Sequence, residues 1–208
     1  MSENQNPRRG RPGYDQQGML AIAVAAFNEY GYDATSMGAL AERLGVSKSA
    51  IYHHFASKDE ILDLALDVAL SALEAVVEEV AQPESIGGRD AGRHAADRLE
   101  HVLRGAVHVL VEQLPAVTLL LRVRGNTEVE RRALVRRRAF DQRITALVAE
   151  AQAEGSLRGD IDASVVARLA FGMINSIVEW YRPGGREDSD RLADDVVAIA
   201  LDGMRTRQ

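Results

Sequence analysis

Apolar residues recur at helical spacing along most of the chain, and no stretch shows the two-residue alternation of a β-strand. The repeats are interrupted by glycine and proline, which end helices. The pattern therefore predicts an all-α protein of about nine helices. The expected helical ranges are 14–30, 37–44, 48–55, 57–80, 93–113, 116–124, 128–154, 163–181 and 190–205.

Two of these helices flank a tight turn at Gly45. Thr35, Ser36 and Ser47 stand where a hydroxyl caps the free amides of a helix, and Gly45 suits the left-handed conformation between the two helices. Ile51 and Phe55 continue the apolar face beyond the turn. Two short helices joined by such a turn form a helix-turn-helix, whose second helix enters the DNA major groove.

The helix before this motif is expected to support it. Leu20, Val24 and Phe27 follow helical spacing, and they would pack against the apolar residues of the two short helices. We expect Tyr30 and Tyr32 to fill the same core rather than to contact DNA.

A long helix follows, because Ser57 and Glu60 fit the S-x-x-E capping box. Glycine, proline and polar residues at 83–92 then predict a loop. These features predict four segments: a disordered basic arm at 1–13, a helix-turn-helix domain at 14–56, a connecting helix at 57–82, and a helical C-terminal domain at 83–208.

Composition narrows the class of protein. The 208 residues are 46% hydrophobic, contain no cysteine, and carry a net charge of −6. A chain without cysteine has no disulfide or thiolate metal site, which suits a reducing compartment. No apolar run approaches the roughly 20 residues of a membrane span, and the polar start lacks a signal-peptide core. We therefore expect a soluble, cytoplasmic protein without a membrane partner.

The acidic balance does not exclude DNA binding. Residues 1–58 carry six Lys and Arg against five Asp and Glu, so the acidic excess lies after them. Lys48 and Lys58 are the only lysines in the chain, and both fall at the helix-turn-helix. Phosphate contact depends on the local field and not on total charge.

No motif supports an enzyme. The chain has no phosphate-binding G-x-x-x-x-G-K-[ST], no G-x-S-x-G and no H-E-x-x-H. His94, His101 and His108 recur every seven residues, but successive members would stand about 10 Å apart along a helix. We expect these histidines to form a polar stripe without a metal, opposite the apolar Leu99 and Leu103, and we expect no cofactor.

The motifs at 35–36, 41–48 and 51–58 closely resemble the N-terminal domain of TetR-type transcriptional regulators. The similarity is dense over 19–66 and fades into general helical character beyond. It implies a dimer that binds a palindromic operator and is released by a small-molecule effector. The long helix at 57–80 would be the lever, and 83–208 would be the effector-binding and dimerisation domain. Repression is the expected outcome; activation, or action through protein contact as a small-molecule binding module, are the alternatives. The expected DNA contacts are Thr35, Ser36, Ser47, Lys48, Ser49, Tyr52, His53 and Lys58.

The segment Arg9-Gly10-Arg11-Pro12 resembles an AT-hook. Extended arginines around a glycine fit a narrow, A/T-rich minor groove. We expect Arg8, Arg9 and Arg11 to hold the minor groove beside the helix-turn-helix, as an arm.

The last two helices carry more apolar faces than one small core needs. This excess favours burial against a second copy, and the resemblance implies the same homodimer.

The effector is expected to bind in the C-terminal domain. A small, largely apolar ligand, such as an acyl-CoA or an aromatic or lipid metabolite, would lie among the C-terminal helices. Arginines at 131–138 are either a solvated face paired with Glu128 and Glu130 or a phosphate-binding segment. The candidate pocket residues are His101, Arg122, Phe140, Ile144, Phe171 and Asn175.

Overall fold

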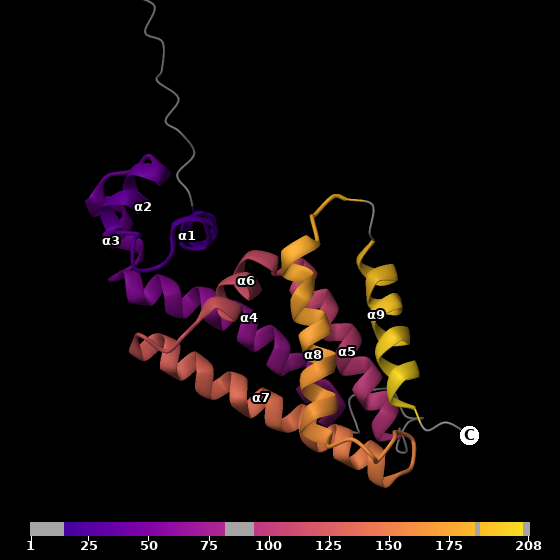
Figure 1. Ribbon diagram of the computed structural model, residues 1–208. Coiled ribbons are helices and arrows are strands. Elements are labelled where there is room, and N and C mark those ends of the chain that lie inside the picture. The colour runs from indigo at the N-terminus through magenta and orange to yellow at the C-terminus, as the bar shows by residue number, and fades with distance from the viewer. Residues whose placement is uncertain (1–14, 82–93, 186–187, 206–208) are drawn as a thin grey trace, which may run out of the picture. The chain divides into compact units, whose positions relative to one another are not determined.

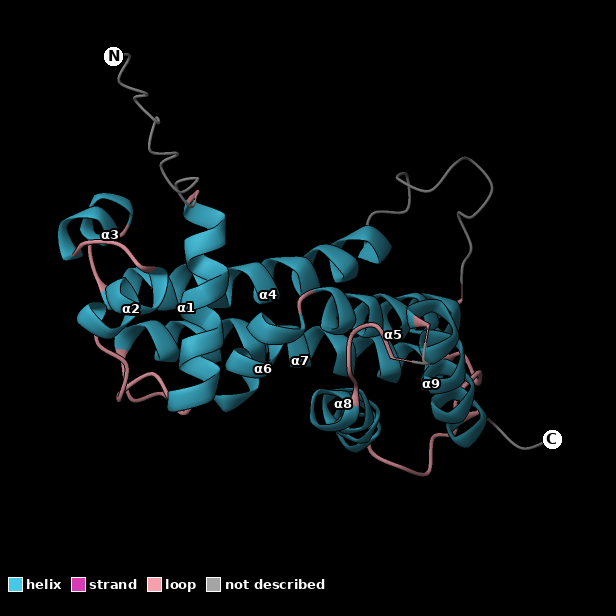
Figure 2. Ribbon diagram, turned by 90° about the horizontal axis from the view of Figure 1, so that it is seen from above, coloured by secondary structure: helices cyan, strands magenta, loops and turns pink. Residues whose placement is uncertain are grey.

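A computed structural model describes residues 15–81, 94–185 and 188–205 of the protein. Within these ranges the chain forms nine helices and no strand (Figure 1, Figure 2), as the hydrophobic pattern predicted. The expected arm at 1–13 and the expected loop at 83–92 lie outside the described residues. The helices are α1 Gln16–Tyr30, α2 Met37–Leu44, α3 Lys48–His54, α4 Lys58–Ala81, α5 Ala95–Glu112, α6 Leu114–Arg122, α7 Glu128–Ala153, α8 Ala163–Trp180 and α9 Ser189–Met204.

The chain divides into two compact units between residues 61 and 62, inside helix α4. In the first unit the predicted caps are present. The hydroxyl of Ser36 accepts from the amide of Ala39 at 3.1 Å, and that of Ser47 accepts from Ala50 at 3.2 Å. Gly45 has φ 67°, the left-handed conformation that ends α2.

The core of the first unit joins α1, α2 and α3. Phe27, Leu40, Ile51 and Phe55 are almost fully buried, as their spacing predicted. Tyr32 packs edge-on against Phe27, with ring centroids 5.2 Å apart. Helix α3, the second helix of the helix-turn-helix, is therefore held by a small apolar core.

Tyr30 was predicted in this core, and that prediction is wrong. Its side chain is 58% exposed at the last residue of α1. The guanidinium of Arg43 lies over the ring, 5.5 Å from its centroid, and pairs with Glu29 at 2.7 Å. Tyr30 follows the last buried residue of the apolar stripe, Phe27, and its ring faces outward, where a cation covers it.

Helix α5 is the centre of the second unit. It packs against α6, α7, α8 and α9 (Figure 1). Leu99, Leu103, Ala106 and Leu110 form its buried face, as predicted from their spacing. Because α5 contacts the other C-terminal helices, its position fixes the surfaces between them.

In the second unit the start of α6 differs from the expected start at residue 116, whereas the start of α7 agrees with the expected one. Pro115 was expected to interrupt the chain before α6, but α6 begins at Leu114 and includes it. Proline is tolerated in the first helical turn, where its missing amide hydrogen would have no partner. At α7, Thr127 and Glu130 also fit the capping-box pattern, which predicts a helix start there, and Thr127 accepts from the amide of Glu130 at 3.1 Å.

Among the described residues, no helix taken singly is long and apolar enough to cross a membrane. Helices α5 and α6 pass the length and composition test only as a pair, and they are bent by 101° relative to each other.

Candidate functional site

Helix α3 presents one polar, exposed face. Lys48, Ser49, Tyr52 and His53 are exposed, whereas Ile51 on the other side is fully buried. The helix is held by its core side and leaves side chains of the type that read base edges free to face a major groove.

The serines before α2 and α3 have structural tasks. Ser36 and Ser47 are exposed, and each hydroxyl accepts a backbone hydrogen bond at a helix start. The hydroxyl of Ser47 also lies 2.9 Å from that of Ser49. A hydroxyl that caps a helix keeps its own hydrogen as a donor, so both serines remain suited to phosphate contact.

Thr35 requires a correction. It was predicted as a cap of α2 and as a DNA contact. Its side chain is 3% exposed, and its hydroxyl donates to the carbonyl of Gly31 at 2.7 Å, while Ser36 alone caps α2. This bond satisfies a carbonyl at the end of α1 and fixes the link to α2. The side chain of Thr35 is therefore part of the fold and not of the exposed face.

Lys58 is partly buried and already engaged. Its ammonium donates to the carbonyl of Tyr32 at 2.9 Å and lies 4.2 Å from the centroid of that ring. The hydroxyl of Tyr32 in turn donates to Asp59 in the first turn of α4. An ammonium has three donors, so two remain for phosphate after this bond.

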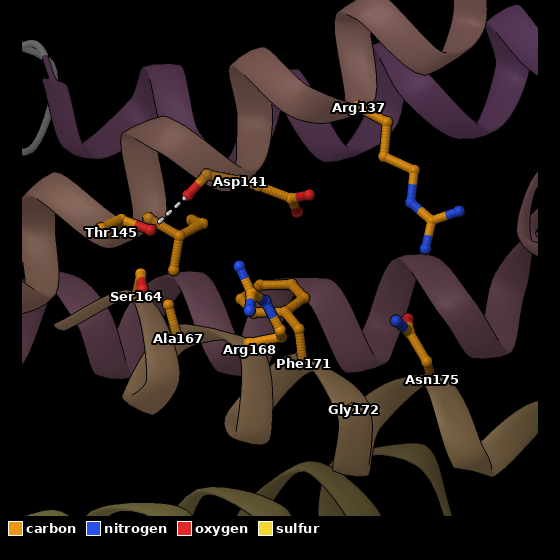
Figure 3. A pocket seen from close by; sticks show the side chains of 10 residues that line it. Arg137, Asp141, Thr145, Ser164, Ala167, Arg168, Phe171, Gly172 and Asn175 are labelled. Atoms are coloured by element: carbon orange, nitrogen blue, oxygen red, sulfur yellow. Dashed lines mark hydrogen bonds between the residues drawn. The ribbon is translucent and has the colours of Figure 1, made fainter. Parts of the chain in front are cut away.

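A cavity of about 220 Å³ lies between α7 and α8 in the second unit. Figure 3 shows Arg137, Asp141 and Thr145 on the α7 wall and Ser164, Arg168 and Asn175 on the α8 wall. Ile144 and Phe171 supply the apolar part of the lining.

The electrostatics of this cavity centre on Asp141. Partial burial raises the pKa of its carboxyl, while the charges of Arg137 and Arg168 act in the opposite direction. The cavity therefore combines two cations, one carboxylate and an aromatic surface. It is more polar than the largely apolar pocket that we expected.

Three of the six predicted pocket residues line this cavity, namely Ile144, Phe171 and Asn175. Phe140 stands behind them, buried, with its ring edge-on to Phe171 at 5.3 Å between centroids. It supports the wall from α7.

The other two predicted pocket residues lie elsewhere. His101 on α5 has its Nε2 atom 2.9 Å from Glu79 Oε2 on α4. Arg122 is exposed at the C-terminal end of α6. Helical spacing identified both as polar residues near apolar ones, but it does not reveal which helix each of them faces.

The histidines of α5 pair with carboxylates from different segments. His94 Nδ1 lies 3.6 Å from Glu154, and His108 Nε2 lies 3.2 Å from Asp190 at the start of α9. No group of three or more potential ligand side chains within the described ranges is placed to hold a metal ion.

The arginines of α7 divide between two surfaces. Arg131 pairs with Glu128 on its own helix, whereas Arg132 and Arg136 pair with acids of α4. Glu130 was expected to pair with these arginines, but it is buried and accepts backbone amides, among them Gly125 and Asn126 at 2.7 Å each. The carboxylate is used to close the turn before α7 and is not available to the arginines.

Four polar lining residues were not predicted, namely Asp141, Thr145, Ser164 and Arg168, and Arg137 was predicted only as part of the arginine segment at 131–138. Their spacing in the sequence could have indicated these residues. Positions 137, 141 and 145 in α7 are four residues apart, and so are positions 164, 168 and 172 in α8, which places each set on one face of its helix. Each series places polar or small residues in a row beside an apolar stripe. Two such rows facing each other make a polar cleft.

Helices α8 and α9 leave large apolar side chains exposed. Leu169 is 68% exposed and Ile199 is 66% exposed, and both line an apolar hollow of about 250 Å³ between the two helices. Val165 and Trp180 on α8 are exposed as well.

Two family profiles match the chain. The profile described as "Bacterial regulatory proteins, tetR family" matches residues 13–65, and the profile "Tetracyclin repressor-like, C-terminal domain" matches residues 92–204. Together they cover both units of the structure.

Similar proteins agree with these matches. The crystal structure of SCO3833, a member of the TetR transcriptional regulator family from Streptomyces coelicolor A3, is 44% identical, with a TM-score of 0.80 over 95% of this chain and 94% of that one. The transcriptional repressor KstR2 of Mycobacterium tuberculosis (strain H37Rv) is 29% identical over 204 residues, which are 96% of this chain and 94% of KstR2. The structure of AibR in complex with isovaleryl coenzyme A and operator DNA is 21% identical, with a TM-score of 0.71 over 88% of this chain and 96% of AibR, and shares the fold.

Proposed function

The chain belongs to the TetR family of bacterial helix-turn-helix transcriptional regulators, and from this premise we propose that it is a repressor controlled by a small molecule. Its dimer would bind a palindromic operator and leave it when an effector occupies the cavity between α7 and α8. It would act in the cytoplasm, where the DNA is. The observation that carries the proposal is the exposed polar face of α3 on a buried three-helix core.

The proposed DNA contacts within the described residues have exposed or partly exposed side chains on α3 and at the starts of its neighbouring helices. Lys48, Ser49 and His53 would address base edges, because their side chains are exposed on the face of α3 opposite buried Ile51. Backbone phosphates would be held by Ser36, Ser47, Tyr52 and Lys58, and the minor groove by Arg8, Arg9 and Arg11, which lie outside the described residues.

A single α3 helix reads too few base pairs for a specific site, so a second copy is needed. We propose that Leu169 and Ile199 are buried against the same residues of that copy. Their exposure on adjacent helices, around a hollow lined mostly by apolar residues, supports a self-complementary interface with two-fold symmetry.

The effector would act by favouring one spacing of the two α3 helices over another. A palindromic site presents successive major grooves roughly 34 Å apart, and a dimer with another spacing loses half of its contacts. Helix α4 is shared by both units, so a change at its C-terminal part has a covalent path to the first unit. A coupling of about 1.4 kcal/mol changes operator affinity tenfold. The AibR complex is an analogy at the level of the fold, in which effector and operator are bound by one protein.

Selection of bound sequences from random duplex DNA would test the proposal. We expect an inverted repeat whose half-sites are about one helical turn apart, and affinity that falls steeply with salt. Leu169→Asp should give a monomer that no longer binds the selected operator. Val135→Asp is the matched control, because Val135 is 62% exposed on α7 and lines a hollow between α7 and α4. Recovery of single, unpaired half-sites by the wild-type protein would contradict the dimeric mechanism.

A further inference from the structure

Two arginines line the α7–α8 cavity, and the charges of Asp141 and, for Arg168, of Asp162 act on them without a direct ion pair in the described part of the chain. Arg137 on α7 and Arg168 on α8 make no ion pair or hydrogen bond to a described residue, whereas Arg131, Arg132 and Arg136 on α7 are each paired. Guanidinium groups bind carboxylates and phosphates in a fixed, two-pronged geometry. A pair of them on opposite walls of a cavity is complementary to an anion.

The third charged group in the cavity limits the charge of that anion. Asp141 lies on the same wall as Arg137, one helical turn further along, and experiences the charges of both arginines. Two cations and one carboxylate leave a single net positive charge. A ligand with one negative charge balances the site, whereas one with two would be repelled by Asp141.

The size and the apolar lining limit the rest of the ligand. About 220 Å³ is below the usual volume of a pocket for a drug-sized ligand, so the enclosed part of the ligand is small. Phe171, backed by the edge-on ring of Phe140, and Ile144 offer an apolar wall for its body.

We propose that the effector is a small organic acid, whose single carboxylate binds between Arg137 and Arg168 and whose apolar body lies against Phe171. The inference rests on the proposed function, since it names the class of ligand for the same cavity. In this arrangement Asp141 acts as a specificity determinant that disfavours phosphate esters. Asn175 and Ser164 are within the lining and can complete the hydrogen bonds of the carboxylate.

Three probes that share a ring and differ in charge test the proposal, namely benzoate, benzamide and phenyl phosphate at millimolar concentration. Titration calorimetry on the full-length protein should show binding of benzoate, with benzamide and phenyl phosphate binding at least roughly tenfold more weakly. Arg137→Gln and Arg168→Gln should each weaken benzoate binding by about tenfold. Arg138→Gln is the matched control, because Arg138 is an exposed neighbour on the same helix that does not line the cavity. Asp141→Asn should raise the affinity for phenyl phosphate relative to benzoate.

Several results would overturn the inference. These are absence of benzoate binding, equal binding of benzamide, tighter binding of phenyl phosphate, or unchanged benzoate affinity in both arginine variants. If Arg168→Gln shifts the monomer–dimer equilibrium and does not weaken benzoate binding, Arg168 contacts the second copy and not the ligand, which also contradicts the proposal. Operator binding without any probe is measured on the same samples, so failure of the repressor proposal is seen separately from failure of the acid site.

Discussion

Arg136 and Glu74 form a two-pronged ion pair that joins α7 to α4. Arg136 Nε lies 2.9 Å from Glu74 Oε1, and its NH2 lies 2.7 Å from Oε2. The same guanidinium donates to Ser71, one turn before Glu74 on α4, and to Asp67, two turns before it. These bonds, that to Glu74 first, raise the pKa of Arg136, and they lower the pKa of Asp67. The wall of the proposed effector cavity is thus fixed to the helix that continues into the DNA-binding unit.

Replacing Arg136 by Gln should lower the free energy of unfolding by about 1–2 kcal/mol, because Asp67 and Glu74 lose their common partner. The loss of stability is no larger because these side chains are about a third or more exposed, so water replaces part of the lost interaction. Urea denaturation checks it. Arg138→Gln on the same helix should change stability by less than about 0.5 kcal/mol, and an equal loss in both variants would argue against a specific clamp.

The ion pair between Arg158 and Asp160 should make the stability of the protein depend on pH. Arg158 donates two hydrogen bonds to Asp160, at 2.7 and 2.6 Å, and lowers the pKa of that carboxyl from 3.8 to about 2. Because the folded pKa lies below the unfolded one, the stabilisation is present above about pH 4 and is lost as the pH falls towards 2. An NMR titration of the Asp160 carboxyl should therefore show a midpoint well below 3.8 in the wild type.

In Arg158→Gln that midpoint should move up towards the ordinary value. The stability difference between wild type and Asp160→Asn should shrink as the pH is lowered through the same window. A midpoint that Arg158→Gln leaves unchanged would show that the ion pair does not persist in solution.

Thr35→Val should separate folding from DNA contact in the first unit. Valine keeps the volume of threonine but removes the hydroxyl that donates to Gly31, at a cost of about 1–2 kcal/mol in a site that is 3% exposed. Thr35→Ser keeps the donor and should cost less. The salt dependence of operator binding, measured by fluorescence anisotropy, should be the same in both variants and the wild type. A lower slope in Thr35→Val would restore Thr35 to the DNA contacts.

Lys58→Met should affect both stability and DNA binding, unlike Lys48→Ala. Loss of the bond to the Tyr32 carbonyl and of the contact with its ring should cost about 1 kcal/mol. If the remaining donors also hold a phosphate, the slope of log affinity against log salt falls by about one. Lys48 is exposed on α3, so Lys48→Ala should lower the slope and leave thermal stability nearly unchanged. A Lys58→Met variant as stable as the wild type would contradict the packing role.

Local patterns in the sequence were sufficient to predict where the helices begin and end. The hydroxyl caps at Ser36, Ser47 and Thr127 and the left-handed Gly45 depend only on neighbouring residues, so their positions could be predicted within a residue or two. The buried face of α5 followed from spacing alone. These features specify helices and their inner sides without reference to the rest of the fold.

Partners across helices could not be predicted in the same way. The acids that hold Arg136 are more than 60 positions away, and nothing in the local pattern of α7 indicates α4 as their source. Apolar residues predicted the pocket, so Ile144 and Phe171 were among the candidates, whereas Arg168 was not and Arg137 was included only in the arginine segment at 131–138. Whether an arginine is paired or faces a cavity depends on the packing of two helices, which spacing along one helix does not determine.

Gly105 on α5 lies against Val76 on α4, and this approach should not tolerate a methyl group. A Cβ atom at Gly105 would stand 2.5 Å from Val76 Cγ1 and 3.0 Å from Cγ2, well inside contact distance. Gly105→Ala should therefore lower the free energy of unfolding by about 1–3 kcal/mol, although alanine is the better helix former. The double variant Val76→Ala with Gly105→Ala removes the clashing atoms and should recover much of that loss in thermal denaturation. Strictly additive losses would mean that the two residues do not touch, whereas a positive coupling energy identifies their contact as the one that sets the spacing of α4 and α5.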